Sequence, residues 1–360
     1  MPRVALIQFA PLEPAQSCSS FASSSSSASG ASPADDLSLN PLINLQRAHD
    51  LVRSAAHQGA ELVTLPEYFL SGVVSDPAHW HLAQYPHSHA HLAASSASHS
   101  TATHWLSTFQ DLARELRVDI QVGTIVERAV DDDGNELSRD VEVVDDETGD
   151  KRTENRPVLE NVATYIDWEG NILHRYKKRN LWWPEKEYLC EGSEDHQVFN
   201  TRFGKVGMLI CWDLAWPRAF QSLLLQRVDI VLAPTYWTKD DGGPLGLNHN
   251  PNSEVEYLKV LIPTRAWDNE CAIVFTNAGA PAEWTESAGA SKNPHGRIGG
   301  SCVCVPFKGR IGGAEGAHEQ VALVDLDLSI LEDARTVYGV RRGLVTKLKQ
   351  EKALPSWVAE

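Results

Sequence analysis

The sequence has few cysteines, a deficit of positive charge and no long apolar run. Six cysteines occur in 360 residues without regular spacing, which fits free thiols in a reducing compartment better than a disulfide framework. The net charge of −16 disfavours nucleic acid or an anionic membrane as a partner, because both would repel the chain. No run of about 18 apolar residues suits a spanning helix, and the amino terminus lacks the apolar core of a signal peptide. We therefore expect a soluble, cytoplasmic protein.

What the sequence does contain is an alternation of short apolar strands and amphipathic helical segments, and 42% of its residues are hydrophobic. This pattern predicts an α/β fold with a substantial core. Helices are predicted at 42–55, 105–116, 219–227 and 254–268. Strands are predicted at 4–9, 61–65, 119–126, 161–166, 172–176, 206–210, 229–234, 271–276, 299–306 and 321–326.

Several segments do not fit this alternation. A serine-rich tract at about 17–38 is predicted to be disordered, and an acidic stretch at 130–156 is predicted to be a loop or a loose hairpin. Residues 76–104 hold seven histidines among Ala and Ser without partner cysteines, so we expect no metal site there. Residues 235–252 are predicted to be a long loop at the sheet edge, and the basic chain after Arg335 is expected to cross the surface.

One cysteine lies between an apolar strand and a helical segment. The strand at 206–210 leads to Cys211, and Pro217 begins the helical segment. A strand-to-helix turn exposes a nucleophile, and a nearby helix start is expected to lower the pKa of the thiol. A free cysteine is, however, more often buried and inert. A catalytic role for Cys211 therefore depends on the groups around it.

Two other ionisable residues also follow predicted strands. Glu67 comes after the strand at 61–65, at the edge where open α/β sheets place their sites, although a solvated turn carboxylate is the alternative. Lys178 follows the strand at 172–176, in a segment that is either a surface ion-pair network or a partly desolvated cation. Together with Cys211 they would supply a general base, an oxyanion-stabilising ammonium and a nucleophile, which is a set for acyl transfer without histidine.

These residues lie in three separated motifs. The motifs are Leu65-Pro66-Glu67 followed by Ser71-Gly72, then Tyr176-Lys177-Lys178-Arg179-Asn180-Leu181, then Gly207-Met208-Leu209-Ile210-Cys211-Trp212-Asp213 with Pro217. In type and order they resemble the nitrilase superfamily of carbon–nitrogen hydrolases. The family's lysine motif selects Lys178 over Lys177, and Glu185, followed by Leu189 and Gly192, matches its second glutamate. The resemblance covers nearly the whole chain apart from the serine-rich and acidic insertions.

This resemblance implies a four-layer αββα sandwich at residues 1–345, with insertions at about 17–38 and 130–156, and a C-terminal tail at 346–360. It implies that Glu67 deprotonates Cys211, that the thiolate attacks an amide or nitrile carbon, and that Lys178 and the backbone N–H of Trp212 hold the oxyanion. Glu185 would position the lysine and the substrate. Water would then cleave the thioester. No metal or cofactor is implied, and the subunits are expected to form a homodimer or a larger homo-oligomer.

The substrate class is narrowed by the residue after the Cys-Trp pair. True nitrilases of this type usually carry Glu there, and Asp213 instead favours hydrolysis of a small-molecule amide, with nitrile hydrolysis as the alternative. A non-catalytic scaffold is a further alternative, which the intact set of catalytic residue types disfavours. Tyr68, Trp182, Trp212 and Trp237 are the expected substrate-binding residues, suited to an apolar or aromatic acyl group, unless they belong to the core.

Overall fold

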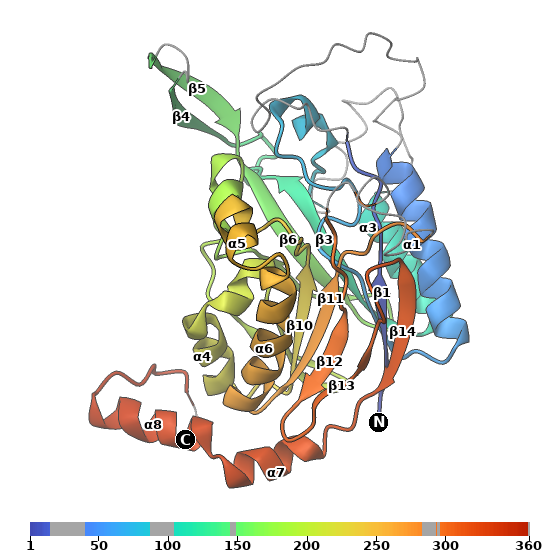
Figure 1. Ribbon diagram of the computed structural model, residues 1–360, viewed down its shortest axis with the longest axis vertical. Helices are drawn as coiled ribbons and strands as arrows, with labels where there is room; N and C mark the ends of the chain where they lie inside the picture. Colours follow the sequence, from blue (N-terminus) through green and yellow to red (C-terminus); the bar gives the residue numbers. More distant parts are fainter. Residues whose placement is uncertain (15–39, 87–103, 145–148, 283–292, 294–295, 359–360) are drawn as a thin grey trace.

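Two six-stranded sheets form the centre of the molecule (Figure 1). The computed structural model describes residues 1–14, 40–86, 104–144, 149–282, 293 and 296–358. The first sheet has the order β14-β1-β2-β3-β6-β7, with β14 (Gln320–Asp325), β1 (Arg3–Gln8), β2 (Leu62–Thr64), β3 (Asp119–Arg128), β6 (Leu159–Ile166) and β7 (Ile172–Lys177). The second has the order β13-β12-β11-β10-β9-β8, with β13 (Gly309–Gly313), β12 (Cys302–Val305), β11 (Ala272–Asn277), β10 (Ile230–Thr235), β9 (Gly204–Met208) and β8 (Val198–Thr201).

Helices cover the outer face of each sheet. The first sheet packs against α1 (Asn40–His57) and α3 (Trp105–Leu116), and the second packs against α4 (Pro217–Leu225) and α6 (Ser253–Asp268) (Figure 1). The predicted four-layer αββα arrangement is therefore confirmed. Each of these helices was expected from its apolar periodicity, because a helix that covers a sheet buries one stripe of side chains.

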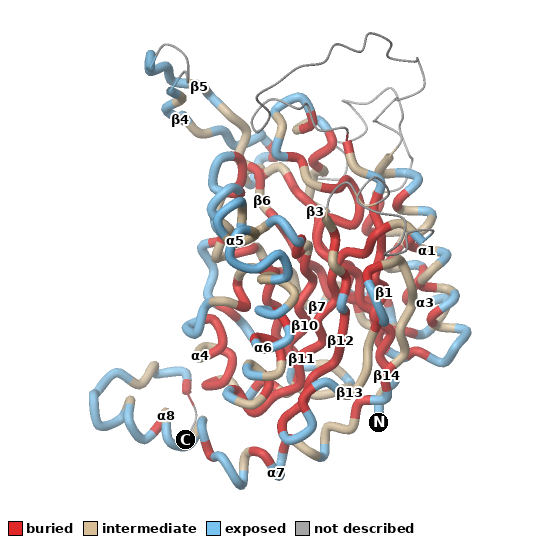
Figure 2. The backbone as a smooth tube through the Cα atoms, viewed as in Figure 1, coloured by how far each residue is buried: buried red, intermediate tan, exposed pale blue. Residues whose placement is uncertain are grey.

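The inner strands β1, β2, β10 and β11 are buried on both faces, which explains why they read as apolar runs. In β1, Val4 and Leu6 pack in the core shared with the second sheet, whereas Ala5 and Ile7 pack against the helices that cover the first sheet. Successive side chains of a strand point to opposite faces, so one short strand serves both cores. Figure 2 shows the buried residues concentrated along the strands in the middle of the molecule.

The parallel strands bring their carboxyl ends to one edge of the sandwich. In the first sheet β1, β2 and β3 are parallel, and β7, antiparallel to β6, runs in their direction. In the second sheet β9, β10 and β11 are parallel. The Glu67 N–H donates to the Thr235 carbonyl at 3.3 Å, and the hydroxyls of Thr64 and Thr276 lie 2.6 Å apart. Segments that follow strands of both sheets therefore meet at this edge.

Some elements differ from the expectation. The region 235–252 contains a helix, α5 (Gly243–His249), so the prediction of a loop throughout was wrong. None of the residues in α5 is buried, and a helix that buries no face carries no apolar periodicity. The basic chain near the carboxyl end crosses the surface as helices α7 (Ile330–Val337) and α8 (Val340–Gln350), and α8 spans residues 345 and 346, where the tail was expected to begin. The edge strands β8 and β13 were not predicted.

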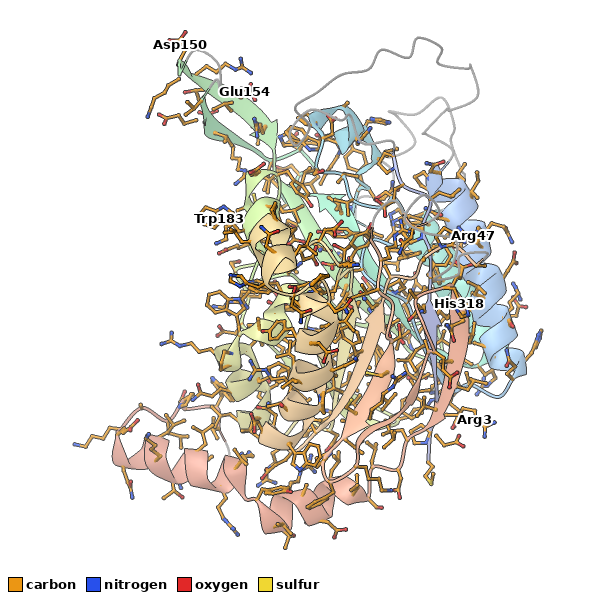
Figure 3. All side chains as sticks on the ribbon, viewed as in Figure 1. Arg3, Arg47, Asp150, Glu154, Trp183 and His318 are labelled. Atoms are coloured by element: carbon orange, nitrogen blue, oxygen red, sulfur yellow. The ribbon has the colours of Figure 1, made fainter. Side chains whose placement is uncertain are left out.

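The acidic insertion was predicted to be a loop or a loose hairpin, and it forms a hairpin. Strands β4 (Ser138–Val144) and β5 (Lys151–Pro157) pair with each other and extend away from the sandwich, and the side chains of Asp150 and Glu154 lie on this projection (Figure 3). The serine-rich tract and most of the histidine-rich segment lie outside the described residues. Over the ranges that the structure describes, no three His, Cys, Asp or Glu side chains are grouped as a metal site, and no helix is long and apolar enough to cross a membrane.

Candidate active site

Cys211 lies at the strand-to-helix turn where it was predicted. It is the first residue of a short 3₁₀ helix, η5 (Cys211–Ala215), which follows β9 and precedes α4. Its φ of 47° lies in the left-handed region, which is uncommon for a residue with a side chain and is found at active sites. The Cys211 side chain is nearly covered, with the residue 8% exposed. The turn therefore holds the thiol in a strained and fixed position at the sheet edge.

Asp213 holds this turn against the segment that carries the lysine. Its Oδ2 accepts hydrogen bonds from the Ile210 N–H at 2.9 Å and the Tyr176 hydroxyl at 2.8 Å. Its Oδ1 accepts from the backbone N–H of Asn180 at 2.9 Å and from Asn180 Nδ2 at 2.7 Å. Sequence reasoning used Asp213 only to narrow the substrate class. An acidic residue in the first turn of a helix is the signal that could have indicated this capping role.

Glu67 follows β2 and is 1% exposed. Its Oε1 accepts hydrogen bonds from Lys178 Nζ and Asn161 Nδ2, both at 2.8 Å, and its Oε2 accepts from the Tyr236 N–H at 2.8 Å. Asn161 and Tyr236 were not identified from the sequence. A polar side chain in the apolar strand β6 was the available signal for Asn161, whereas Tyr236 contributes a backbone group that no residue type reveals.

Lys178 lies between two carboxyl groups. Its Nζ is 2.8 Å from Glu67 Oε1 and 2.7 Å from Glu185 Oε1, and the lysine side chain is 1% exposed. Glu185, in the 3₁₀ helix η4 (Trp183–Glu187), also accepts hydrogen bonds from the Tyr68 hydroxyl and the Trp182 N–H. The neighbouring Lys177 instead pairs with Glu160 and is 42% exposed. The structure thus brings Glu67, Lys178 and Glu185 together and keeps Lys177 at the surface.

Burial controls the protonation of these groups. It raises the pKa of Glu67 to about 7, although the charge of Lys178 acts in the opposite direction and that of Glu185 adds to the rise. Burial would lower the pKa of Lys178, but the carboxyl groups of Glu185 and Glu67 outweigh it and raise that pKa well above its ordinary value. The ammonium is therefore retained at neutral pH, while Glu67 titrates there.

The thiol differs from the sequence-based expectation. Burial raises the pKa of the Cys211 thiol well above its ordinary value, and the charge of Glu67 raises it further while Lys178 opposes the rise. The expected lowering by the helix start was wrong, because loss of water from around the sulfur outweighs it. The thiol is protonated at neutral pH, and it lies close enough to Glu67 for the two groups to shift each other's pKa. A thiol of this kind needs a base beside it to become a nucleophile.

The four aromatic residues expected to bind substrate surround these groups in different ways. Tyr68 is buried and its hydroxyl donates to Glu185, and Trp182 is half-buried beside the same glutamate. The ring of Trp212, next to Cys211, lies 5.7 Å from that of Trp237. Trp237 is 2% exposed and its indole N–H donates to Glu254 at 2.8 Å, so this tryptophan is also part of the core.

Comparison with known proteins gives several relatives of similar length. A nitrilase from Pyrococcus abyssi is 24% identical over 299 residues, which cover 82% of this chain and 88% of the relative. An N-carbamoylputrescine amidase from Solanum lycopersicum is 24% identical over 316 residues, covering 86% and 87%. A probable nitrilase from Schizosaccharomyces pombe is 29% identical over 151 residues, so that match spans 41% of this chain and half of the relative.

Solved structures share the fold. Nit3 from Saccharomyces cerevisiae, a member of the nitrilase superfamily, superimposes with a TM-score of 0.61 at 19% identity and 93% coverage of both chains. An amidase from Nesterenkonia sp. AN1 gives a TM-score of 0.59 at 18% identity, over 94% of this chain and 95% of the amidase. The sequence model described as carbon-nitrogen hydrolase matches residues 28–336, which is most of the chain. The protein therefore belongs to the carbon-nitrogen hydrolase family, within the nitrilase superfamily.

Proposed function

We propose that the protein hydrolyses the amide of a small molecule through a thioester on Cys211, releasing ammonia or an amine and a carboxylic acid. The observation that carries this proposal is the burial of a protonated thiol beside Glu67, whose pKa is about 7, and Lys178. A carboxyl group that titrates near neutral pH is suited to take a proton and to return it within one catalytic cycle.

In the first half-reaction, Glu67 takes the proton from Cys211 as the sulfur forms a bond to the carbonyl carbon. The negative charge that develops on the carbonyl oxygen is stabilised by Lys178 and by the backbone N–H of Trp212, which lies in the first turn of η5, where backbone N–H groups have no partner within the helix. Glu67 then gives its proton to the departing nitrogen. The carbon–nitrogen bond breaks and the acyl group remains on sulfur as a thioester.

In the second half-reaction, Glu67 takes a proton from water as the water oxygen attacks the thioester carbon. The same donors hold the oxyanion, the carbon–sulfur bond breaks, and the thiol recovers its proton from Glu67. Lys178 keeps its charge throughout, because its pKa is raised well above neutrality. Glu185 fixes the ammonium from the other side at 2.7 Å, which reserves the remaining donor capacity of Lys178 for the substrate oxygen.

Two lines of similarity support an amide rather than a nitrile as substrate. Asp213 stands where nitrilases of this type usually carry Glu, and the structure engages its carboxylate in holding the cysteine turn. The amidase that shares the fold has been solved with the acetamide moiety of fluoroacetamide on its active-site cysteine. Nitrile hydrolysis is the second candidate, favoured by the similarity to the nitrilase from Pyrococcus abyssi.

The test is ammonia release from aliphatic and aromatic amides, N-carbamoyl compounds and nitriles. Cys211→Ala should lower turnover by at least about 10³-fold, as loss of a covalent nucleophile does. Cys271→Ala is the matched control, because Cys271 is also a buried free thiol but precedes β11 at the opposite end of the strands. An acyl group found by mass spectrometry on the Cys211 peptide would identify the intermediate.

The outcomes separate the alternatives. Turnover of an amide by the wild type and by Cys271→Ala, but not by Cys211→Ala, supports the proposal. Turnover of nitriles alone would replace it with the nitrilase function. No turnover across the panel by folded protein would favour a non-catalytic scaffold, and activity that survives in Cys211→Ala would refute the mechanism.

A further inference from the structure

A buried ion pair lies close to the candidate active site but includes none of its expected residues. Arg297 pairs with Glu13, and their side chains are 4% and 2% exposed. Glu13 follows β1, and Arg297 precedes β12, so the two residues are 284 positions apart in the sequence. Burying an ion pair costs desolvation free energy, and the attraction between the two charges often does no more than offset this cost, so stability alone is a weak reason for the presence of the pair. The contacts of Arg297 and Glu13 indicate a different reason.

The Arg297 guanidinium binds segments that follow strands of both sheets. Its Nη1 donates to the Gly279 carbonyl at 3.2 Å, and its Nη2 donates to the Pro11 carbonyl at 3.1 Å and to Glu13. Its Nε donates to the Tyr236 hydroxyl at 3.3 Å, and this hydroxyl donates to Glu13. The guanidinium carbon also lies 5.5 Å from the centre of the Tyr236 ring. The planar fork of an arginine suits this set of fixed acceptors, which a lysine could not reproduce.

Tyr236 connects this cluster to the base. Its backbone N–H donates to Glu67 Oε2 at 2.8 Å, whereas Lys178 and Asn161 both donate to the other oxygen, Oε1. The placement of Oε2 therefore depends on where the Tyr236 backbone lies, and the Tyr236 side chain is fixed by Arg297 and Glu13. A displacement of about 1 Å in a reacting group can cost about 10²-fold in rate.

We propose that Arg297, with Glu13, is a positioning residue that orients the Glu67 carboxylate through Tyr236. The proposal rests on the proposed role of Glu67 as the base. It explains why a costly buried ion pair lies at this edge of the sandwich. It also gives a residue just before β12 a part in the reaction, although Arg297 does not touch the reacting atoms.

The experiment compares Arg297→Gln and Arg297→Lys with Arg335→Gln. The control removes an arginine whose Nη2 lies 2.6 Å from Asp229 Oδ1, just before β10 and so at the opposite end of the strands. Arg297→Gln should lower kcat by about 10- to 100-fold with KM changed less than about twofold, because orientation rather than substrate contact is lost. Arg297→Lys should recover only part of the loss, and Arg335→Gln should leave kcat unchanged.

The pH profile distinguishes positioning from a general loss of structure. In Arg297→Gln the Tyr236 N–H should move away from Glu67 Oε2. A carboxylate that loses a hydrogen-bond donor has a higher pKa, so the acid limb of kcat/KM should move to higher pH. The groups around Glu67 that titrate or carry charge are intact in this variant; they are Lys178, Glu185, Cys211, Tyr68 and Tyr188. The folded fraction of each variant is measured by circular dichroism. If the acid limb of kcat/KM stays in place and kcat/KM falls only in proportion to the folded fraction, the proposal is overturned. If Arg297→Gln does not fold, Tyr236→Phe replaces it in the test, because this variant removes only the hydroxyl that Arg297 and Glu13 hold. The acid limb of kcat/KM should then also move to higher pH, by a smaller amount. An acid limb that does not move in Tyr236→Phe would overturn the proposal.

A second readout does not require turnover. The rate at which iodoacetamide alkylates Cys211, followed by peptide mass spectrometry from pH 5 to 9, reports the titration of the group that takes the thiol proton. The step near pH 7 should move to higher pH in Arg297→Gln, disappear in Glu67→Gln and stay in place in Arg335→Gln. This result in a protein that hydrolyses none of the amides or nitriles would uphold the positioning role while the proposed function fails. A step that is lost in Glu67→Gln but keeps its wild-type position in Arg297→Gln would refute the positioning role alone.

Discussion

Replacing Glu185 by glutamine should shift the pH dependence of the enzyme toward lower pH. In the wild type the pKa of Glu67 is about 7, so as a base it becomes competent as the pH rises through 7. With a single titration at that pKa, about a tenth of Glu67 is ionised at pH 6 and about nine tenths at pH 8, so kcat/KM should rise about tenfold between them. The rise with pH follows from the need for the ionised carboxylate.

The shift in the variant follows from the charges around Lys178. The charge of Glu185 raises the pKa of Glu67, and Glu185 also shares the ammonium at 2.7 Å. Without this charge, the attraction of Lys178 acts on Glu67 alone. The acid limb should move down by about one pH unit, the lower end of what a single charge within about 4–6 Å produces and worth about 1.4 kcal/mol. The plateau rate should also fall, because Lys178 loses the partner that fixes it.

The assay is kcat/KM for an amide that is turned over, measured from pH 5 to 9 in buffers of constant ionic strength. Glu187→Gln is the matched control, since Glu187 lies in the same 3₁₀ helix as Glu185 but is exposed. Its profile should coincide with that of the wild type. A limb in Glu185→Gln that remains near pH 7 or moves upward would refute the assignment of that limb to Glu67.

Two further outcomes are expected. Both carboxylate oxygens of Asp213 accept hydrogen bonds, so in Asp213→Asn the amide NH₂ must face groups that are themselves donors, whichever way the amide is turned. The substitution should therefore cost about 2–4 kcal/mol of unfolding free energy and lower the midpoint of thermal unfolding. A midpoint equal to that of the wild type would contradict the four hydrogen bonds assigned to Asp213. We also propose that the outer helical layer forms a homo-oligomer contact, because Trp216, Tyr257 and Val260 are 45%, 39% and 64% exposed there. Light scattering should then give a dimer or larger assembly that Val260→Asp dissociates, and a monomeric wild type would refute this.

The elements with strong apolar patterning were predicted well. The helix at 105–116 has the bounds of α3, because its buried residues recur at helical spacing against the first sheet. The order of strands and helices also sufficed to place Glu67 and Cys211 at the carboxyl ends of β2 and β9. In contrast, α5 buries no side chain, and a helix without a buried stripe leaves no periodicity to recognise.

The partners of the site residues could not be derived from the sequence, because they depend on contacts between distant segments. Glu67 is bound by Asn161 and Tyr236, which lie 94 and 169 positions away. The pKa of the Cys211 thiol likewise follows from how completely the fold covers it, and a local helix start was a poor guide to this. Motifs singled out the candidate reacting groups, whereas their protonation depends on packing between the sheets.

The net charge of the buried cluster suits Glu67 to the role of base that we propose for it. One ammonium, Lys178, lies within 2.8 Å of two carboxyl groups, and all three side chains are buried. A single cation balances one carboxylate, so ionising the second leaves an excess negative charge that burial makes costly, and this cost keeps the pKa of Glu67 near 7. In the proposed mechanism, transfer of the Cys211 proton to Glu67 moves this excess charge to the sulfur as it attacks, and from there to an oxygen beside Lys178. The proposal therefore needs the second glutamate beside the lysine as much as it needs the lysine itself.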